Sequence, residues 1–168
     1  PMTLRANARR GDATSYRARL IDAGLLPDAP AADLTRQLPG YAPIVLPHGV
    51  PVQRLPGFDA GDVSIQDAAA QLAAPLLIHA GGTPLPPGSR VLDACAAPGG
   101  KTAHLLEQAD LDVTALDADP GRLSRVDEGL SRLGLKARTL AADASQPATW
   151  WDGKPYDATV DPNVIDAD

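Results

Sequence analysis

Residues 90–117 read RVLDACAAPGGKTAHLLEQADLDVTALD, and this stretch decides the fold class. Two short apolar runs, over 90–93 and 113–117, flank a glycine-containing turn and a segment of helical composition over 102–108. A strand, turn, helix and strand in this order is a βαβ unit, in which the two strands lie parallel. The stretch therefore predicts an α/β domain built on a parallel sheet.

The alternation of strands and helices continues toward the C-terminus. Pro120 and Gly134 bound the next predicted helix, because proline fits the first helical turn and glycine commonly ends a helix. Further strands are predicted over 136–141 and 156–161. Residues 89–168 are therefore expected to form a partial parallel sheet of the Rossmann-like type.

The first 88 residues follow a different pattern. Residues 1–60 predict a small α+β module, separated from the sheet by an alanine-rich helix and a Pro/Gly-rich linker over 61–88. The elements predicted in the module are a strand over 3–8, a helix over 12–24, and short strands over 44–46 and 50–55.

Composition excludes several classes of protein. The chain of 168 residues is 44% hydrophobic and only 4% aromatic, which is typical of a helix-rich α/β protein. A single cysteine, Cys95, excludes a disulfide framework and predicts a reducing, cytoplasmic location. No apolar run approaches the length of a membrane span, and the three histidines are scattered. We expect neither membrane association nor a metal site.

Charge is unevenly distributed along the chain, whose net charge is −6. Residues 1–60 carry seven arginines against five aspartates, whereas the remainder carries eight basic against sixteen acidic residues. Arg5, Arg9 and Arg10 crowd the first ten positions, a weak indication of a surface that contacts nucleic-acid phosphates. The alternative is an ordinary solvated face.

The turn after the first strand of the parallel sheet is the prime candidate site, because ligands bind beyond the carboxyl ends of such strands. Gly99 and Gly100 lack a Cβ, so a ligand could approach the backbone, and the amides that open the next helix favour a carboxylate. A phosphate loop would need a glycine where Cys95 stands, and the spacing of a dinucleotide fingerprint does not occur. A methyltransferase cofactor turn and a purely structural turn remain.

Four aspartates fall at the carboxyl ends of the four predicted strands: Asp93, Asp117, Asp143 and Asp161. A carboxylate at Asp117 could accept hydrogen bonds from both ribose hydroxyls of an adenosine cofactor. Asp143 could bond the adenine amino group. Helix capping explains one or two such acids but accounts poorly for all four.

The segment from Asp93 to Thr102 resembles the D-x-C-A-A-P-G-G-K-T signature of RNA 5-methylcytosine methyltransferases, and is most similar to that of the bacterial Sun-type members that modify 16S ribosomal RNA. The segments 55–58 and 64–71, together with 122–126 and 130–134, are similar to the same members. The resemblance runs from about residue 2 to residue 160 and is strongest over 89–143.

This resemblance implies a class I methyltransferase fold that uses S-adenosylmethionine, and a small RNA-recognition-like domain over 1–60. Asp117 would then hold the ribose, Asp143 would lie on the adenine side, and Asp161 would sit between cofactor and base. Arg5, Arg9 and Arg10 would contact RNA. The turn residues expected to bind the cofactor are Cys95, Ala96, Ala97, Pro98, Gly99, Gly100 and Lys101.

Two cysteines of the family have no counterpart in these residues. Family members attack cytosine with a cysteine thiolate from a T-C-S motif and release the product with a second cysteine from D-A-P-C. Residues 161–163 read Asp-Pro-Asn, and Cys95 is expected to be a partly buried packing thiol. We therefore expect the 168 residues to be the cofactor-binding half of the enzyme, which alone would bind S-adenosylmethionine weakly or not at all and turn over no RNA. The alternatives are a methyltransferase for another substrate class and a non-catalytic module that binds RNA or protein.

Overall fold

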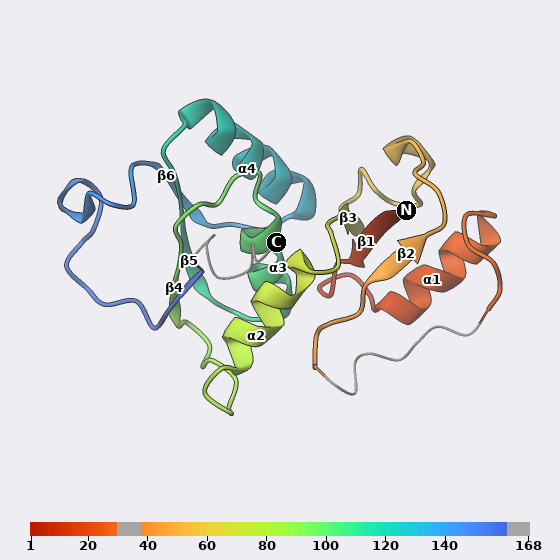
Figure 1. Ribbon diagram of the computed structural model, residues 1–168, viewed down its shortest axis with the longest axis horizontal. Coiled ribbons are helices and arrows are strands. Elements are labelled where there is room, and N and C mark those ends of the chain that lie inside the picture. The colour runs from red at the N-terminus through yellow and green to blue at the C-terminus, as the bar shows by residue number, and fades with distance from the viewer. Residues whose placement is uncertain (30–37, 161–168) are drawn as a thin grey trace.

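The computed structural model describes residues 1–29 and 38–160, which form two units in contact with each other (Figure 1). The N-terminal unit consists of the described residues up to 65 and contains a three-stranded antiparallel sheet. The parallel-sheet unit, residues 70–160, contains four strands and three α-helices. The parallel sheet agrees with the sequence-based expectation.

The N-terminal unit is organised around its first strand. Strand β1 (Met2–Ala6) lies between β2 (Ile44–Leu46) and β3 (Val63–Ile65) and pairs antiparallel with both. Helix α1 (Ala13–Asp22) begins where the Asp12 carboxylate accepts a hydrogen bond from the Ser15 amide, at 2.6 Å. The core between helix and sheet consists of Leu4, Tyr16, Leu20, Leu25, Ile44, Leu46, Leu55 and Val63.

Two details of this unit differ from the sequence-based prediction. Residues 50–55 contain a short 3-10 helix, η1 (Val52–Arg54), instead of a strand. Pro51 precedes it and Pro56 follows it, and a residue without an N–H cannot donate to a strand ladder. Strand β3 lies in the segment expected to link two domains, yet it pairs with β1. The N-terminal sheet therefore continues past the predicted boundary at residue 60, which itself stays a prediction.

The linking helix starts later than predicted. A 3-10 turn, η2 (Ala70–Leu72), leads into α2 (Ala73–His79), where one helix over 68–79 was expected. Pro75 explains the change, because it has no N–H to donate to the carbonyl four residues earlier and is tolerated only in a first helical turn.

The parallel sheet has the strand order β6-β5-β4-β7. Its elements are β4 (Arg90–Asp93), α3 (Gly100–Gln108), β5 (Asp112–Asp117), α4 (Pro120–Leu133), β6 (Arg138–Ala141), the 3-10 turn η3 (Pro147–Thr149) and β7 (Ala158–Val160). The chain moves outward from β4 to β5 and β6, then returns to place β7 on the other side of β4. The strand order thus reverses beside β4, where such sheets bind their ligands.

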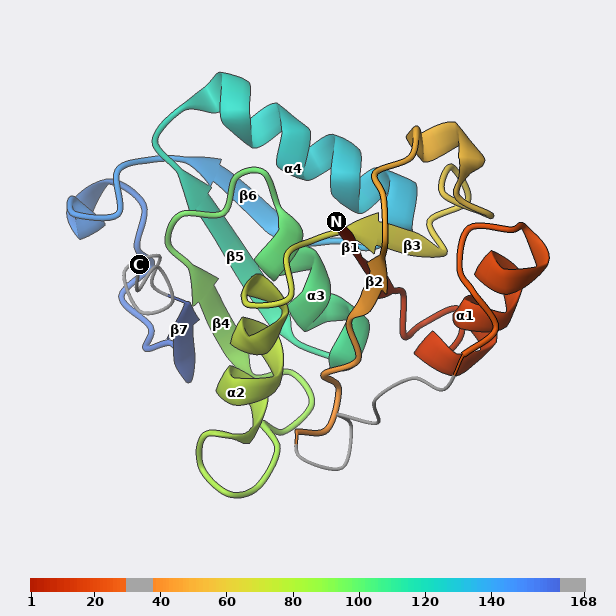
Figure 2. The ribbon, with the colours of Figure 1, turned by 45° about the vertical axis from the view of Figure 1, so that its right-hand side comes forward.

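Helices α2, α3 and α4 lie side by side on one face of the parallel sheet (Figure 2). Right-handed crossovers in the same direction place α3 and α4 on that common face. The core beneath them includes Ile78, Val91, Leu105, Val113, Ala115, Val126 and Leu130. Among the described residues, no helix combines the length and the apolar character that crossing a bilayer requires.

An arginine of α4 joins the two units. The Arg132 guanidinium donates to the Phe58 carbonyl at 2.5 Å and the Val63 carbonyl at 3.0 Å, and it lies 4.2 Å from the centre of the Phe58 ring.

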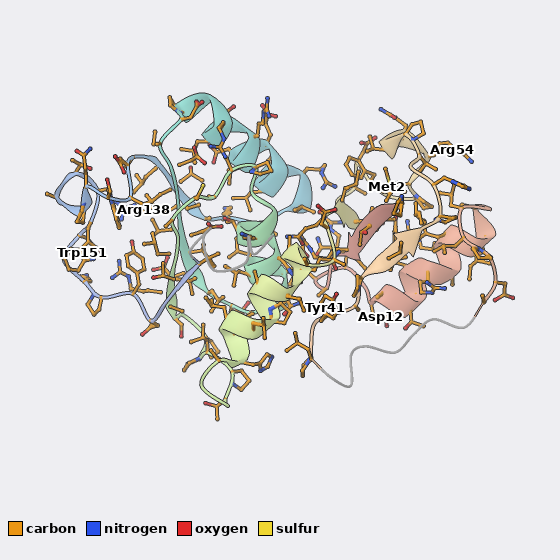
Figure 3. The ribbon with its side chains drawn as sticks, viewed as in Figure 1. Met2, Asp12, Tyr41, Arg54, Arg138 and Trp151 are labelled. Atoms are coloured by element: carbon orange, nitrogen blue, oxygen red, sulfur yellow. The ribbon has the colours of Figure 1, made fainter. Side chains whose placement is uncertain are left out.

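Far from this interface, Figure 3 shows Trp151 and Arg138 at the end of the molecule opposite Arg54 of the N-terminal unit.

Candidate functional site

The turn between β4 and α3 is closed at its base by two buried side chains. Asp93 ends β4 and is 1% exposed, and the fully buried Thr102 hydroxyl donates to its carboxylate at 2.6 Å. Burial raises the pKa of Asp93, while the hydrogen bonds from Thr102 and from the Cys95 amide act in the opposite direction. These bonds connect the two ends of the turn and fix the start of α3 relative to the sheet.

The Cβ positions missing from the two glycines of the turn both face neighbouring protein atoms. Gly99 has a φ of +102°, and a Cβ there would lie 3.2 Å from the Cα of Val126 on α4. A Cβ on Gly100 would lie 3.3 Å from the Nε2 of Gln66. Both missing Cβ atoms therefore face the protein itself, at helix α4 and at Gln66, and the expectation that these glycines admit a ligand stays a prediction.

Helix α3 starts immediately after Gly99 and has no side-chain N-cap. The amides of a first helical turn lack partners within the helix and carry partial positive charge. Because α3 begins at the carboxyl end of β4, these amides lie at the edge of the sheet where ligands bind. The position suits a carboxylate or another small anion.

Asp117 extends from the end of β5 toward the same turn. Its carboxylate accepts from the Ala97 amide at 3.2 Å through one oxygen and from the Asp119 amide at 3.1 Å through the other. The residue is 3% exposed. An ionised carboxylate can accept about four hydrogen bonds, so Asp117 keeps the capacity for two further donors. A pair of ribose hydroxyls supplies two donors.

Arg122 was not predicted as a site residue, yet it covers Asp117. Its guanidinium lies 3.6 Å from the Asp117 carboxylate and donates to the Ala97 carbonyl at 3.2 Å. The Arg122 side chain is 51% exposed, so it can move aside at little cost. The sequence offers no local signal for this contact, because the turn and α4 meet only in the folded chain.

The hydrogen bonds of the Asp143 carboxylate stay within its own turn, and Asp161 lies outside the described residues. Asp143 is exposed and accepts from the Ser145 amide at 2.9 Å and the Ser145 hydroxyl at 2.7 Å. These bonds lower the pKa of the Asp143 carboxyl, with the Ser145 hydroxyl contributing most. Asp161, predicted to lie between cofactor and base, falls outside the described residues. The expected roles of both acids stay predictions.

One side chain of the turn, that of Cys95, has a different environment from the expected one. Cys95 is exposed, so the prediction of a partly buried packing thiol is wrong. Ala96, the next residue, is 4% exposed and occupies the core position instead. Ala97 and Lys101 are half-buried, Pro98 is exposed, and the Ala97–Pro98 peptide bond is cis.

The three arginines expected to contact RNA have different environments. Arg5 is 3% exposed, and its guanidinium is bonded inside the protein to Glu107 on α3, at 2.8 and 2.9 Å. Arg9 is exposed and donates to the Leu106 carbonyl at 3.0 Å and to Asp110 at 2.7 Å. Arg10 is exposed, and with Arg9 and Lys136 it borders a cleft of about 900 Å³. Of these three arginines, only Arg9 and Arg10 face solvent.

Histidine and acidic side chains form no cluster of three that could hold a metal ion within residues 1–29 and 38–160. His104, on α3, is 2% exposed, and burial lowers its pKa to about 3. It is therefore neutral at physiological pH and faces Gln108, whose amide nitrogen lies 2.7 Å from its Nε2.

Comparison with known proteins supports the sequence resemblance. Residues 84–167 match the family described as 16S rRNA methyltransferase RsmB/F. The chain is 47% identical over 168 residues to ribosomal RNA small subunit methyltransferase B of Xylella fastidiosa strain Temecula1, covering 95% of this chain and 34% of that protein. It is 49% identical over 158 residues to the protein of the same name from Pseudomonas putida, covering 93% and 33%. The chain therefore spans about a third of the length of these relatives.

Solved structures show the same arrangement of elements. A methyltransferase homologue from Pyrococcus horikoshii superimposes with a TM-score of 0.69 at 25% identity, over 89% of this chain and 46% of that chain. NSun6 from the same organism gives a TM-score of 0.51 at 26% identity, over 60% and 25%. The likeness to the first covers both units of the present fold.

Proposed function

The chain belongs to the 16S rRNA methyltransferase RsmB/F family, and from this premise we propose that its parallel-sheet unit binds S-adenosylmethionine. The protein would be an RNA (cytosine-5-)-methyltransferase of the cytoplasm, transferring a methyl group to C5 of a cytosine in 16S ribosomal RNA. Bound S-adenosylmethionine would supply an electrophilic methyl group on its sulfonium. The residues of this chain would bind and orient it.

The single observation that carries the proposal is the position of the Asp117 carboxylate. It lies at the carboxyl end of β5, touches the amide of Ala97 in the turn after β4, and has acceptor capacity for two more donors. Ribose hydroxyls placed there would put the amino-acid end of the cofactor near the start of α3, whose uncapped amides suit its carboxylate. The turn from Cys95 to Lys101 would line this end, and the adenine would extend toward Asp143.

Binding of S-adenosylmethionine tests the proposal directly. We expect calorimetry to detect binding by the 168-residue chain, and Asp117→Asn to weaken it by about tenfold to a hundredfold, because the amide offers fewer and uncharged acceptors. Asp22→Asn, an exposed aspartate in the N-terminal unit, makes the same change of charge away from the turn and should leave the affinity unaltered. Equal affinities for the two variants would refute the assignment of Asp117.

We also propose that Arg9 and Arg10 contact RNA phosphates, at the edge of the parallel sheet opposite the turn after β4. Both are exposed beside the same cleft, which Lys136 also lines together with Asp110 and Asp112, and Arg9 is paired with Asp110 at 2.7 Å. Replacing Arg10 with alanine should weaken binding of a 16S rRNA fragment similarly across sequences and reduce the salt slope by about one. An unchanged slope would refute the proposed phosphate contact of Arg10.

A further inference from the structure

All three nitrogens of the Arg5 guanidinium donate hydrogen bonds to other residues of the protein. Nε and Nη2 donate to the two oxygens of Glu107 at 2.8 and 2.9 Å, and Nη1 donates to the side chain of Gln66 and to the Gly100 carbonyl at 3.0 Å. The side chains of Arg5 and Glu107 are 4% and 1% exposed. Through Arg5, strand β1 of the N-terminal unit is therefore hydrogen-bonded to helix α3 of the parallel-sheet unit at a buried position.

The partners of Arg5 lie at opposite ends of α3 but on one face. Gly100 is the first residue of the helix, and Glu107 follows seven positions later, a spacing that returns to the same face after two turns. The Gly100 peptide directly follows the turn whose amides would meet the cofactor. Arg5 thus fixes the start of α3 from outside the parallel-sheet unit.

Stability alone does not explain this arrangement. A buried ion pair is often no more stabilising than well-packed apolar residues, because removing two charges from water offsets their attraction. What the fork of a guanidinium does supply is geometry, since it fixes several acceptors relative to one another. Here the acceptors are Glu107, Gln66 and the Gly100 carbonyl. Because Gly100 directly follows the turn after β4, Arg5 fixes the position of that turn.

We propose that Arg5 is a positioning residue for S-adenosylmethionine, holding the first peptide of α3 so that docking of the N-terminal unit sets the affinity of the parallel-sheet unit for its cofactor. This inference rests on the proposed function. It assigns Arg5 a role inside the protein in place of the RNA contact that its sequence neighbourhood suggests.

The decisive variant is R5M/E107L, which replaces the buried pair with apolar side chains and leaves neither charge unpaired. We expect it to fold and to bind S-adenosylmethionine about tenfold more weakly, the effect of one lost hydrogen bond to the turn. R5K serves as a second variant if the double variant does not fold. A lysine keeps the charge opposite Glu107 but lacks the second arm that reaches the Gly100 carbonyl, so it should also bind more weakly.

Arg132→Met is the matched control. Arg132 joins the same two units through Phe58, Val63 and Ser64, and none of its hydrogen bonds in the described residues reaches the turn, although its positive charge opposes the rise in the pKa of Glu107. This control should lower the Tm while leaving the dissociation constant of S-adenosylmethionine within about twofold of that of the unaltered chain. An equal loss of affinity in R132M and R5M/E107L would mean that general loosening of the interface is responsible, and would overturn the proposal.

A readout without cofactor separates this inference from the proposed function. In the cofactor-free chain, the amide chemical shifts of Gly99, Gly100 and Lys101 should change in R5M/E107L and in R5K but not in R132M. Unchanged shifts with unchanged cofactor affinity would overturn the positioning role while leaving the Asp117 site intact. Changed shifts, in a chain for which Asp117→Asn has no effect on S-adenosylmethionine, would support the coupling of Arg5 to the turn and refute the cofactor assignment instead.

Discussion

The turns that follow β4 and β6 both carry an aspartate at or just beyond a strand end, yet the two aspartates make different kinds of contact. Asp93 is buried and bonded to Thr102 across the turn, on the next helix. Asp143 is exposed and bonded to Ser145 and Gln146, within its own turn. The same residue at the same end of a parallel strand can therefore connect elements or merely shape a loop.

This difference separates the turn that resists deformation from the one that can adapt. The turn after β4 is held by α4 through Gly99, by Asp117 of β5 and by Arg5 of the N-terminal unit. The turn after β6 is held by bonds among its own residues, such as that from the Trp150 indole to the Asp143 carbonyl at 3.0 Å. The first is pre-organised by long-range contacts, as a binding site needs to be.

The largest expected difference between the two turns is in stability. Asp93→Ala removes the acceptor of a buried hydroxyl and of a backbone amide, and should lower the free energy of unfolding by about 3 kcal/mol. Asp143→Ala, at an exposed position, should lower it by only a small fraction of that amount. Urea denaturation of both variants measures the change in unfolding free energy. Comparable losses would show that the two turns depend on their aspartates to the same extent.

The two glycines of the first turn give a smaller but sharper contrast. Gly99→Ala places a Cβ at a φ of +102° and 3.2 Å from backbone of α4, so we expect a loss of about 2 kcal/mol. Gly100→Ala places its Cβ 3.3 Å from the end of the Gln66 side chain, and the change in unfolding free energy should stay below about 1 kcal/mol. Denaturation midpoints measure both, and a larger loss for Gly100 than for Gly99 would contradict this account.

Local signals predicted the parallel-sheet unit well. Helix α4 runs from Pro120 to Leu133 with Gly134 in the left-handed conformation, as proline and glycine at its two ends predicted. Strands β4 and β5 fall on the predicted apolar runs within one residue. Such signals act within a few residues of one another, so one sequence is enough to show them.

Long-range contacts explain what the sequence did not show. The partner of Arg5 is Glu107, 102 residues away, and a basic cluster near the N-terminus suggested a surface role instead. Strand β3 (Val63–Ile65) pairs with β1 across the predicted boundary, and a pairing between strands so far apart in the sequence leaves no local signal. Cys95 was expected to be packed, but the turn directs Ala96 inward in its place. Of the candidate site, the positions of the turn and of Asp117 could be predicted, whereas the contacts that Arg5 and Arg122 make with it could not.

The smallest expected effect is on the pH dependence of the unfolding free energy, to which the two aspartates should contribute with opposite signs. Burial raises the pKa of Asp93 above its ordinary value of 3.8, so the folded state binds this proton more readily than the unfolded state. Its contribution to stability therefore falls as the pH rises from 3.8 through the folded pKa. The pKa of Asp143 is lowered from 3.8, so its contribution is present above 3.8 and is lost as the pH falls through the folded pKa.

Asparagine variants isolate these slopes, because each removes one titrating group and leaves every other group in place. The unfolding free energy of the unaltered chain minus that of Asp93→Asn should decrease with rising pH, whatever constant offset the amide introduces. The corresponding difference for Asp143→Asn should increase with rising pH, over a window that lies below 3.8. Chemical denaturation from about pH 2 to pH 7 measures both differences. Slopes of the same sign would mean that the two carboxyls have similar surroundings in solution, and the contrast between the connected turn and the local one would not hold.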